Sequence, residues 1–477
     1  MKKIFYFLFL LTGCFFAQHE SCLLDIEKTD LQQGIDYAQS SVELVENFPE
    51  DWWTLFGDEQ LNSMIEMALE CNPTISEAQY RICLAYEMAM EARSKLLPYF
   101  NALGEYEREK LPLYGFGLPG FIPLLAPLNR NFNLIQMLIN GSFEIDLWGK
   151  NRNLFLGKLN ETTAAYADML QTKIILSTSI ASAYFSLQSH LKQLEILEEQ
   201  AKDKGGVTAL LNQRFEKGMA DEFWVFREDS ELAIVVDQIE RMRGVIESDR
   251  HTLCALVSNT ASLCGQTAEV VVTPSASFQQ PFPLPKELPI NLIRRRPDIR
   301  ALIWKIEASS KRVKAAKARF LPNLDLFGTV GFISFFWNHL TQTQAFDYDA
   351  GGSSMLPLYT GGELGARLGQ SQQELEIAVS QYNQKLLTAV KEVSDALSEL
   401  KTADERLIAI EEALEDSEAL YRLTDQKFEH GIETLVSVLN ARYSVMVQEL
   451  TRQEIHLARM EAIVALIRSI GGGYGGS

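Results

Sequence analysis

The chain has 477 residues, of which 47% are hydrophobic and 22% are charged, and its 63 acidic side chains outnumber 44 basic ones to give a net charge of −19. A composition this apolar excludes general disorder, and an acidic chain of this size would repel nucleic acid over most approaches, so no nucleic-acid partner is expected. Beyond residue 16 there is no run of 18 or more apolar residues, so a membrane-spanning helix is not predicted.

The first residues are typical of an export signal followed by a lipid attachment site. Two lysines precede a short apolar run, Ile4–Leu11, which is too short to anchor a chain in a membrane. The run ends in Leu11-Thr12-Gly13-Cys14, which resembles the bacterial lipobox, where the cysteine is acylated and becomes the first residue of the mature protein. We therefore predict a signal peptide over residues 1–13, lipidation at Cys14 and a lipid-anchored linker over 14–51. The alternative is an ordinary signal that is cleaved elsewhere.

Export would place the other cysteines in an oxidising compartment. Because Cys83 and Cys254 lie in helical patterns, we favour buried free thiols for Cys71, Cys83, Cys254 and Cys264. The alternative is two local disulfides, one between Cys71 and Cys83 and one between Cys254 and Cys264. The six histidines are scattered, and no HExxH, CxxC or methionine cluster occurs, so neither a metal nor a cofactor is predicted. No catalytic motif survives a check of its context, so we name no catalytic residue and expect no enzyme.

The chain repeats itself. The segment Arg214–Gly218 recurs 213 residues later as Lys427–Gly431. Two further motifs are repeated in the same order: Leu96-Leu97-Pro98 corresponds to Phe320-Leu321-Pro322, and Leu147-Trp148-Gly149 corresponds to Leu358, Tyr359 and Gly361. Three repeated motifs in one order predict two copies of one unit of about 210 residues. We place them at 52–265 and 293–470, with a Pro-rich equatorial linker at 266–292 and a flexible tail at 471–477.

Each copy carries a long helical pattern. The seam after Gly361 consists of Val379, Tyr382, Leu386, Ala389, Val393, Ala396, Leu400, Ala403, Leu407, Ile410, Leu414, Ser417, Tyr421, Thr424 and Phe428. This 3–4 spacing predicts a coiled-coil-like helix of roughly 105 Å, and the stretch from Gly149 to Gly218 predicts its counterpart. Gly218 and Gly431 are expected to cap these helices before the chain turns back, and Gly205-Gly206 favours a kink in the first.

The remaining segments complete two helical hairpins. In the first copy a return helix over 219–258 is stacked on a shorter helix over 74–97, and in the second copy a return helix over 432–470 is stacked on one over 297–321. The summed length of each stacked pair matches the length of the long helix beside it. Leu387 and Ile408 lie off the seam, so the second long helix is expected to contact two neighbours. The soluble alternative for such helices is a scaffold of bundled coiled coils.

Strand patterns argue against that alternative. Over about 12 residues one face carries Ile135, Met137, Ile139, Gly141, Phe143, Ile145 and Leu147, and polar residues alternate with them. Strands are predicted at about 98–107, 135–147, 322–332 and 347–358. Strands of this length with one apolar face are typical of outer-membrane barrels. Four strands cannot close a barrel, since about eight is the minimum, so either three copies close a twelve-stranded barrel or the strands form a small soluble sheet.

The ordered motifs together resemble those of one family. They are the lipobox, Trp52-Trp53-Thr54-Leu55-Phe56-Gly57-Asp58, Asn72-Pro73, Phe143-Glu144-Ile145-Asp146-Leu147-Trp148-Gly149, Arg294-Arg295-Arg296-Pro297-Asp298-Ile299, Pro357-Leu358-Tyr359 and the two Phe-x-x-Gly turns. The chain thereby resembles the TolC-like outer-membrane efflux proteins, in particular the NodT-type lipoprotein branch.

The resemblance implies a mainly α-helical fold with a small membrane β part, assembled as a homotrimer with a twelve-stranded barrel and a twelve-helix tunnel through the periplasm. It implies a cell outer-membrane location, and as partners a periplasmic adaptor and an inner-membrane transporter, of the RND type, besides outer-membrane lipid. The expected function is a passive exit duct for small molecules or drugs. The alternatives are the exit duct of a type I peptide or protein secretion system, or a lipid-tethered periplasmic scaffold without a pore.

An exit duct needs a wet lumen and an end that closes. The predicted barrel-lining residues are Asn140, Ser142, Glu144, Asp146, Asn323, Asp325 and Thr329. The predicted closable end lies at the helix turns and comprises Phe215, Asp221, Glu222, Trp224, Phe428, Glu433, Ser437 and Asn440.

The resemblance suggests a ring of carboxylates and a basic residue beyond the second turn. Ser437, Asn440 and Glu433 occupy those positions here, so the sequence departs from that pattern. We expect instead a plug of Phe428 and Trp224 with Asp221 and Glu222; the alternative is an ordinary hairpin core with solvated caps. The triple Arg294-Arg295-Arg296 precedes Pro297 at a helix start, which favours a structural role over a binding patch.

Overall fold

The computed structural model describes residues 44–45, 49–110, 131–257, 284–285 and 295–473. They fall into two compact units, one built from segments within 1–81, 165–302 and 380–477, the other from segments within 82–164 and 303–379. Each unit therefore draws on both halves of the chain. The predicted lipidation site Cys14 and most of the predicted linkers 14–51 and 266–292 lie outside the described residues.

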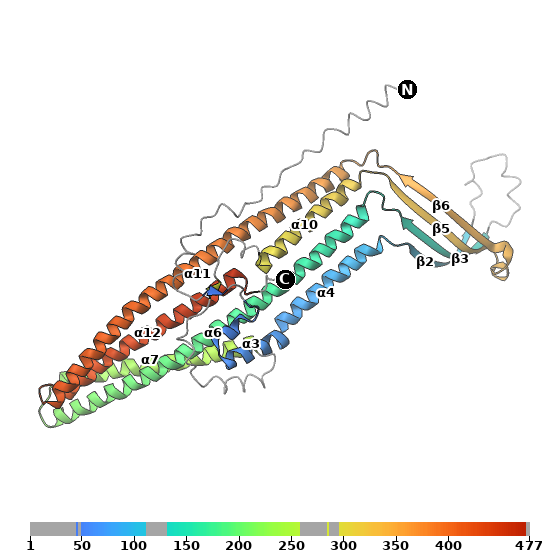
Figure 1. Cartoon of the computed structure of the whole chain (residues 1–477). Helices are drawn as coiled ribbons and strands as arrows, with labels where there is room; N and C mark the ends of the chain where they lie inside the picture. The colour runs from blue at the N-terminus through green and yellow to red at the C-terminus, as the bar shows by residue number, and fades with distance from the viewer. Residues whose placement is uncertain (1–43, 46–48, 111–130, 258–283, 286–294, 474–477) are drawn as a thin grey trace, which may run out of the picture. The chain divides into compact units, whose positions relative to one another are not determined.

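Three pairs of helices have matched lengths. The longest, α6 (Lys150–Glu216) and α11 (Glu363–Glu429), have 67 residues each. The return helices α7 (Glu222–Val257) and α12 (Leu435–Ile470) have 36 each, and α4 (Pro73–Ser94) and α10 (Pro297–Ala318) have 22 each. Figure 1 shows each long helix ending at a turn into its return helix. This correspondence confirms the two-fold repeat and the mainly helical fold.

The glycine pair of the first copy does not break its long helix. Helix α6 continues through Gly205 and Gly206, and the expected kink at this pair stays a prediction. A glycine pair weakens a helix by about 2 kcal/mol relative to alanine, but packing over 67 residues outweighs that cost. The seam of α11 is buried as expected from Val379 to Leu414, apart from a half-buried Leu407, whereas Leu387 and Ile408 remain 62% and 69% exposed.

The core of the first unit gathers around the Trp52-Trp53 motif. This motif forms a short 3-10 helix, η2 (Trp52–Phe56), followed by α3 (Glu59–Cys71), which the sequence analysis did not predict. Trp52 is fully buried, and Phe56 makes an edge contact with Phe185 of α6 at 5.0 Å between ring centroids. Asp58 caps α3 and also accepts a hydrogen bond of 2.6 Å from the Tyr184 hydroxyl. The motif therefore ties the N-terminal segment to the long helix.

Two residues that precede helix-starting prolines bind the ends of the return helices. Asn72 donates its side-chain amide to the carbonyl of Leu256 in α7 at 2.7 Å. Arg296 donates to the carbonyl of Ser469 in α12 at 2.8 Å, and Ser469 is the position equivalent to Leu256 in the second repeat. The two hydrogen bonds satisfy carbonyls that helix ends leave without a partner. A structural role for Arg296 is thereby supported.

Arg296 is also the centre of a buried charged cluster. Its side chain, 3% exposed, contacts Asp298 at 2.8 Å and Glu392 at 2.7 Å, and Lys385 reaches Asp298 at 2.9 Å. Burial alone would raise the pKa of Asp298, but the bonds from Arg296 and Lys385 outweigh burial and hold that pKa below its usual value. Arg295 next to it is exposed.

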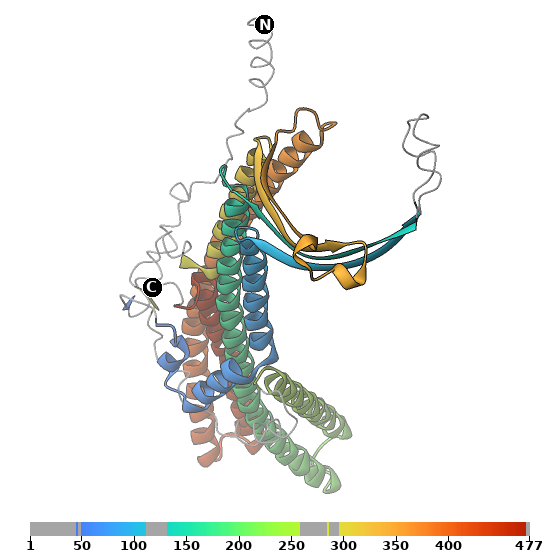
Figure 2. The same cartoon turned by 90° about the vertical axis from the view of Figure 1, so that its right-hand side faces the viewer.

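The second unit contains an antiparallel sheet. Its strands are β2 (Tyr99–Lys110), β3 (Asn131–Glu144), β5 (Asn323–Ser334) and β6 (Phe346–Met355), in the order β2-β3-β5-β6. Figure 2 shows the strands as one curved sheet. All four predicted strands exist, and β3 and β6 each end three residues before the predicted end. A second pairing joins β1 (Leu44–Val45) and β4 (Leu284–Pro285) in parallel.

The cysteines differ from the favoured prediction. Cys71 and Cys83 are free but exposed, and Cys254 is buried and disulfide-bonded. The expectation of a buried free thiol is therefore wrong for these three residues, and Cys264 lies outside the described residues. Periodicity identified Cys83 as helical, but it could not tell which face of the helix the residue occupies. No helix within the described ranges carries the long apolar stretch that a membrane crossing requires.

Candidate channel wall and helix turns

The strand register sorts polar and apolar side chains onto opposite faces of the sheet. Asn140 of β3 lies opposite Asn101 of β2 and Thr329 of β5, and Thr329 lies opposite Asp349 of β6. Directly paired residues point to the same side, so these four side chains form one polar row across the sheet. Thr329 donates to the Asn140 side chain at 3.0 Å. The predicted alternation of faces is present in β2, β3 and β5, with Leu138 and Phe327 among the apolar residues on the polar face.

The polar face is acidic. Within the four strands it carries Glu105, Glu107, Glu109, Glu144, Asp325, Asp347 and Asp349, and no lysine or arginine of these strands lies on it. A cation from outside the sheet, Lys150 at the start of α6, reaches Glu144 at 2.5 Å. A surface with carboxylates on every strand has a negative potential that attracts cations and repels anions.

Most of the predicted lining residues occupy this face. Ser142 and Glu144 are on β3, and Asn323 and Asp325 are on β5, joined by a hydrogen bond of 2.7 Å. Asp146 differs, because β3 ends at Glu144. Its carboxylate accepts from the backbone N–H groups of Asn151 and Arg152 at 3.2 and 2.7 Å. Its placement in a strand is therefore wrong: polarity fits a strand face and a helix N-terminus equally well.

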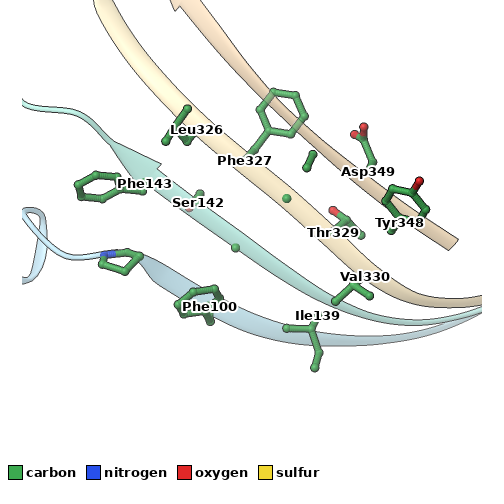
Figure 3. A pocket seen from close by; sticks show the side chains of 14 residues that line it. Phe100, Ile139, Ser142, Phe143, Leu326, Phe327, Thr329, Val330, Tyr348 and Asp349 are labelled. Atoms are coloured by element: carbon green, nitrogen blue, oxygen red, sulfur yellow. The ribbon is translucent and has the colours of Figure 1, made fainter.

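The opposite face is apolar and hollowed over paired glycines. Gly141 of β3 lies directly opposite Gly328 of β5, and an open hollow lies there. Figure 3 shows Phe100, Phe143 and Leu326 among its lining side chains. A methyl group on Gly141 would come within 2.8 Å of the Phe100 ring, so glycine allows the aromatic side chain of β2 to lie over β3. The result is an apolar surface without charged groups over the middle of the strands.

The two helix turns have the same construction. Gly218 and Gly431 have φ angles of 70° and 72°, a left-handed conformation that favours glycine. In the first turn the N–H of Met219 donates to the carbonyl of Arg214 at 2.8 Å, and in the second the N–H of Ile432 donates to that of Lys427 at the same distance. Both glycines are therefore helix caps, as the sequence predicted.

Aromatic side chains are exposed at these turns. Phe215, Trp224 and Phe428 are 42%, 48% and 38% exposed. Trp224 contacts the ring of Phe223 at 5.3 Å between centroids, and the guanidinium of Arg227 lies over it at 5.4 Å. Within the described residues of one chain, no ring contact joins Trp224 to Phe428. A plug built from these side chains remains a prediction that concerns an assembly.

The polar residues at the turns have local roles. Asp221 accepts from the N–H of Phe223 at 3.1 Å at the start of α7, where Glu222 is exposed. In the second turn, Thr434 caps α12 by accepting from the N–H of Ser437 at 3.3 Å. Glu433 and Ser437 are half-buried and Asn440 is exposed. The two positions beyond this turn are Ser437 and Asn440, and neither carries a carboxylate.

A buried charge cluster near the first turn was missed by the sequence analysis. Lys204 of α6, with its side chain 5% exposed, donates to Glu228 at 3.2 Å and to Glu231, both in α7. Burial alone would lower the pKa of Lys204, but its hydrogen bonds to Glu231 and Glu228 outweigh burial and raise that pKa. Its ammonium also lies 4.7 Å from the centre of the Tyr443 ring of α12.

Asp203, which precedes Lys204 on α6, links the two helical hairpins. Arg442 of α12 contacts the carboxylate of Asp203 at 3.2 Å and that of Glu199 at 3.8 Å. Burial raises the pKa of Asp203, and the positive charge of Arg442 opposes that rise. The second repeat has Asp416 and Ser417 at the positions equivalent to Asp203 and Lys204. A comparison of the repeats position by position was the one signal that could have revealed this difference.

Known proteins resemble the chain along nearly its whole length. A family model described as outer membrane efflux protein matches residues 64–254 and 288–472. The multidrug resistance outer membrane protein MdtP of Escherichia coli K12 is 25% identical over 98% of this chain and 94% of its own length, and the putative multidrug resistance outer membrane protein MdtQ of the same strain is 25% identical over 98% and 96%.

Solved structures share the fold. The Campylobacter jejuni CmeC outer membrane channel is 22% identical with a TM-score of 0.83, covering 95% of this chain and 95% of its own. The outer membrane protein VceC of Vibrio cholerae is 24% identical with a TM-score of 0.78, covering 90% and 100%. At this level of identity the likeness concerns the fold alone.

Proposed function

The chain belongs to the outer membrane efflux protein family, and from that premise we propose that three copies of it form the exit duct of a tripartite efflux pump. As a member of this family it is an efflux channel protein of the outer membrane that extends into the periplasm. The observation that carries the trimer is the open sheet of four strands. One copy cannot bury both its sheet edges and its apolar face.

The edges specify how the copies would join. Within the described part of the chain β2 and β6 are the edge strands, and one side of each pairs with no other strand there. Backbone groups at membrane depth must be hydrogen-bonded, because lipid offers them no partner. Pairing β6 of one copy with β2 of the next satisfies both edges, and three copies give twelve strands. The apolar face then meets lipid, and the acidic face lines the lumen.

The polar residues of the sheet and the turns take their roles from this assembly. Asn140, Ser142, Glu144, Asn323, Asp325 and Thr329 line the barrel lumen, and Asp146 lies at the start of the helical tunnel. The turn residues Phe215, Trp224 and Phe428 close the periplasmic end at rest, with Asp221 and Glu222 beside them. Because the lumen is only a path, the chain performs no reaction and holds no cofactor.

The cargo and partners follow from the relatives. MdtP and MdtQ carry the name multidrug resistance, which supports small molecules or drugs as cargo. A passive duct needs an energised inner-membrane transporter, of the RND type, and a periplasmic adaptor between them. Acylation of Cys14 would add a lipid anchor to the barrel. Coupling to peptide or protein secretion is the second candidate, since a wet duct does not select its own cargo.

Native mass spectrometry and planar bilayers test this proposal together. The detergent-purified protein should have the mass of three chains, and its addition to a planar bilayer should give discrete single-channel currents. A monomer that stays soluble without detergent and gives no current would contradict the duct and favour a tethered scaffold instead.

A further inference from the structure

The outer end of β2 segregates its charges by face. In the run Glu105-Tyr106-Glu107-Arg108-Glu109-Lys110 the three glutamates lie on the polar face of the sheet. The register places Tyr106, Arg108 and Lys110 on the other face, opposite Ile135, Asn133 and Asn131. Both cations therefore extend the face that meets lipid in the proposed barrel.

No acidic side chain of the sheet neutralises them. The positions of all four strands that share this face hold no aspartate or glutamate. Among the residues that the structure describes, neither Arg108 nor Lys110 forms an ion pair, and both side chains are exposed. A cation facing hydrocarbon at the bilayer midplane costs about 2–4 kcal/mol, so these two must lie at a depth where an anion can meet them.

Strand length gives that depth. Arg108 is nine positions beyond Tyr99, where β2 begins, which corresponds to about 30 Å along the strand at roughly 3.4 Å per residue. With a tilt of about 40°, Arg108 lies about 23 Å along the membrane normal, which is close to the height of the apolar band of such barrels, about 25 Å. The opposite, N-terminal end of β2 follows helix α4 in the chain. Arg108 and Lys110 therefore lie at the external boundary of the membrane in the proposed barrel.

Aromatic and amide groups complete the surface. Tyr106 stacks on Trp337 with 5.9 Å between ring centroids, and its hydroxyl donates to the Asn133 side chain at 3.1 Å. Trp337 is 64% exposed and Tyr106 54%. Aromatic side chains in such a position are typical of a membrane interface. In this position the side chains of Arg108 and Lys110, beside the aromatic rings, meet the lipid headgroups.

From this arrangement we infer that Arg108 and Lys110 form a binding surface for the phosphate groups of a phosphorylated glycolipid in the external leaflet. Residues two apart on one strand face lie about 7 Å from each other, so the two cations can each meet one phosphate of a headgroup that carries two. Arginine binds a phosphate through paired N–H groups, and lysine adds a point charge. The inference rests on the proposed barrel, because only closure turns this face toward lipid.

The test compares lipid binding to two matched double variants by native mass spectrometry of the detergent-purified trimer. Arg108→Gln/Lys110→Gln removes the surface, and Arg241→Gln/Lys391→Gln removes one arginine and one lysine that are 72% and 76% exposed on helices. The probes are bisphosphorylated lipid A, the same lipid without phosphates, and phosphatidylglycerol.

Wild type and the helix variant should bind bisphosphorylated lipid A at least tenfold more tightly than the phosphate-free form. The strand variant should lose that preference while remaining trimeric. An unchanged preference in the strand variant would overturn the inference. So would an equal loss of phosphatidylglycerol binding, which would indicate an ordinary phospholipid instead. Single-channel current from the same preparations distinguishes failure of the lipid-binding inference from failure of the proposed duct. Current without lipid selectivity contradicts the lipid-binding inference alone, whereas absence of current contradicts the duct.

Discussion

The cluster around Arg296 allows a prediction whose size follows from its contacts. Replacing Arg296 with methionine keeps the aliphatic volume but removes the bonds to Asp298, Glu392 and the carbonyl of Ser469. Breaking a buried ion pair costs about 3–5 kcal/mol. Two features place this case at the lower end: Lys385 still contacts Asp298 at 2.9 Å, and Glu392 is 41% exposed and can be hydrated. We therefore expect a loss of about 3 kcal/mol.

Amide hydrogen exchange of the detergent-purified protein measures this loss where it occurs. Local opening of the first turn of α10 and the last turn of α12 should become easier by about 3 kcal/mol, which corresponds to exchange faster by about a hundredfold. Arg295→Met is the matched control, because Arg295 is exposed and its removal should leave exchange unchanged. Less than a tenfold effect, or an equal effect in both variants, would refute this account of the cluster.

The same cluster predicts a pH dependence. The folded protein holds the pKa of Asp298 below its usual value, so the carboxylate stabilises the fold above its unfolded pKa, about 3.9, and that contribution is lost as the pH falls through the folded value. Without Arg296 the pKa of Asp298 should rise, because burial then meets less opposition. The difference between wild type and Arg296→Met should thus be largest near pH 7 and shrink below about pH 4. A difference that grows on acidification would contradict this assignment.

Three further predictions concern the duct and its core. Trp224→Ala and Phe428→Ala should each raise the single-channel conductance of the resting protein, because each removes bulk from the proposed plug. Asp347→Asn with Asp349→Asn should lower the cation-to-anion permeability ratio, measured as a reversal potential in a salt gradient, because the acidic face loses charge. Tyr184→Phe should lower the free energy of unfolding by about 1–3 kcal/mol in a denaturant titration, since the Oδ2 oxygen of the buried Asp58 side chain loses the hydroxyl that donates to it.

Matched controls make these predictions decisive. Tyr80→Ala removes a 73% exposed aromatic side chain from α4 and should leave conductance unchanged. Asp237→Asn removes a carboxylate that is 69% exposed on α7 and should leave the permeability ratio unchanged. Tyr166→Phe removes a hydroxyl from a side chain that is 52% exposed and should leave the free energy of unfolding unchanged. If a control variant behaves like its test variant, the proposed local cause is refuted.

Features with a long period could be predicted from the sequence. The seam from Val379 to Phe428 identified α11 because 3–4 spacing over many turns has no other structural explanation. The positive φ angles of Gly218 and Gly431 were likewise predictable, since a helix that reverses needs a left-handed cap. Alternation over β3 fixed both faces of the sheet before any pairing was known.

Features that depend on contacts between distant segments could not be predicted in the same way. Lys204 looks like a solvated helix residue, because its partners Glu228 and Glu231 lie on the next helix and only packing against that helix buries Lys204 and Glu228. Asp146 continues the alternation of β3, but its carboxylate caps α6. Cys254 is disulfide-bonded, and spacing alone leaves pairing undetermined. In each case the local pattern was compatible with two environments.

Amide exchange at the two edge strands tests the closed wall most directly. About half of the backbone N–H groups of β2 and of β6 point away from their neighbour within the sheet, and only pairing with another copy can protect them. In the protein reconstituted into lipid bilayers, we expect both sets of amides in β2 and in β6 to exchange as slowly as those of the central strands β3 and β5. Rapid exchange of the outward set on either edge strand would show that the sheet stays open, and it would contradict a duct built from several copies.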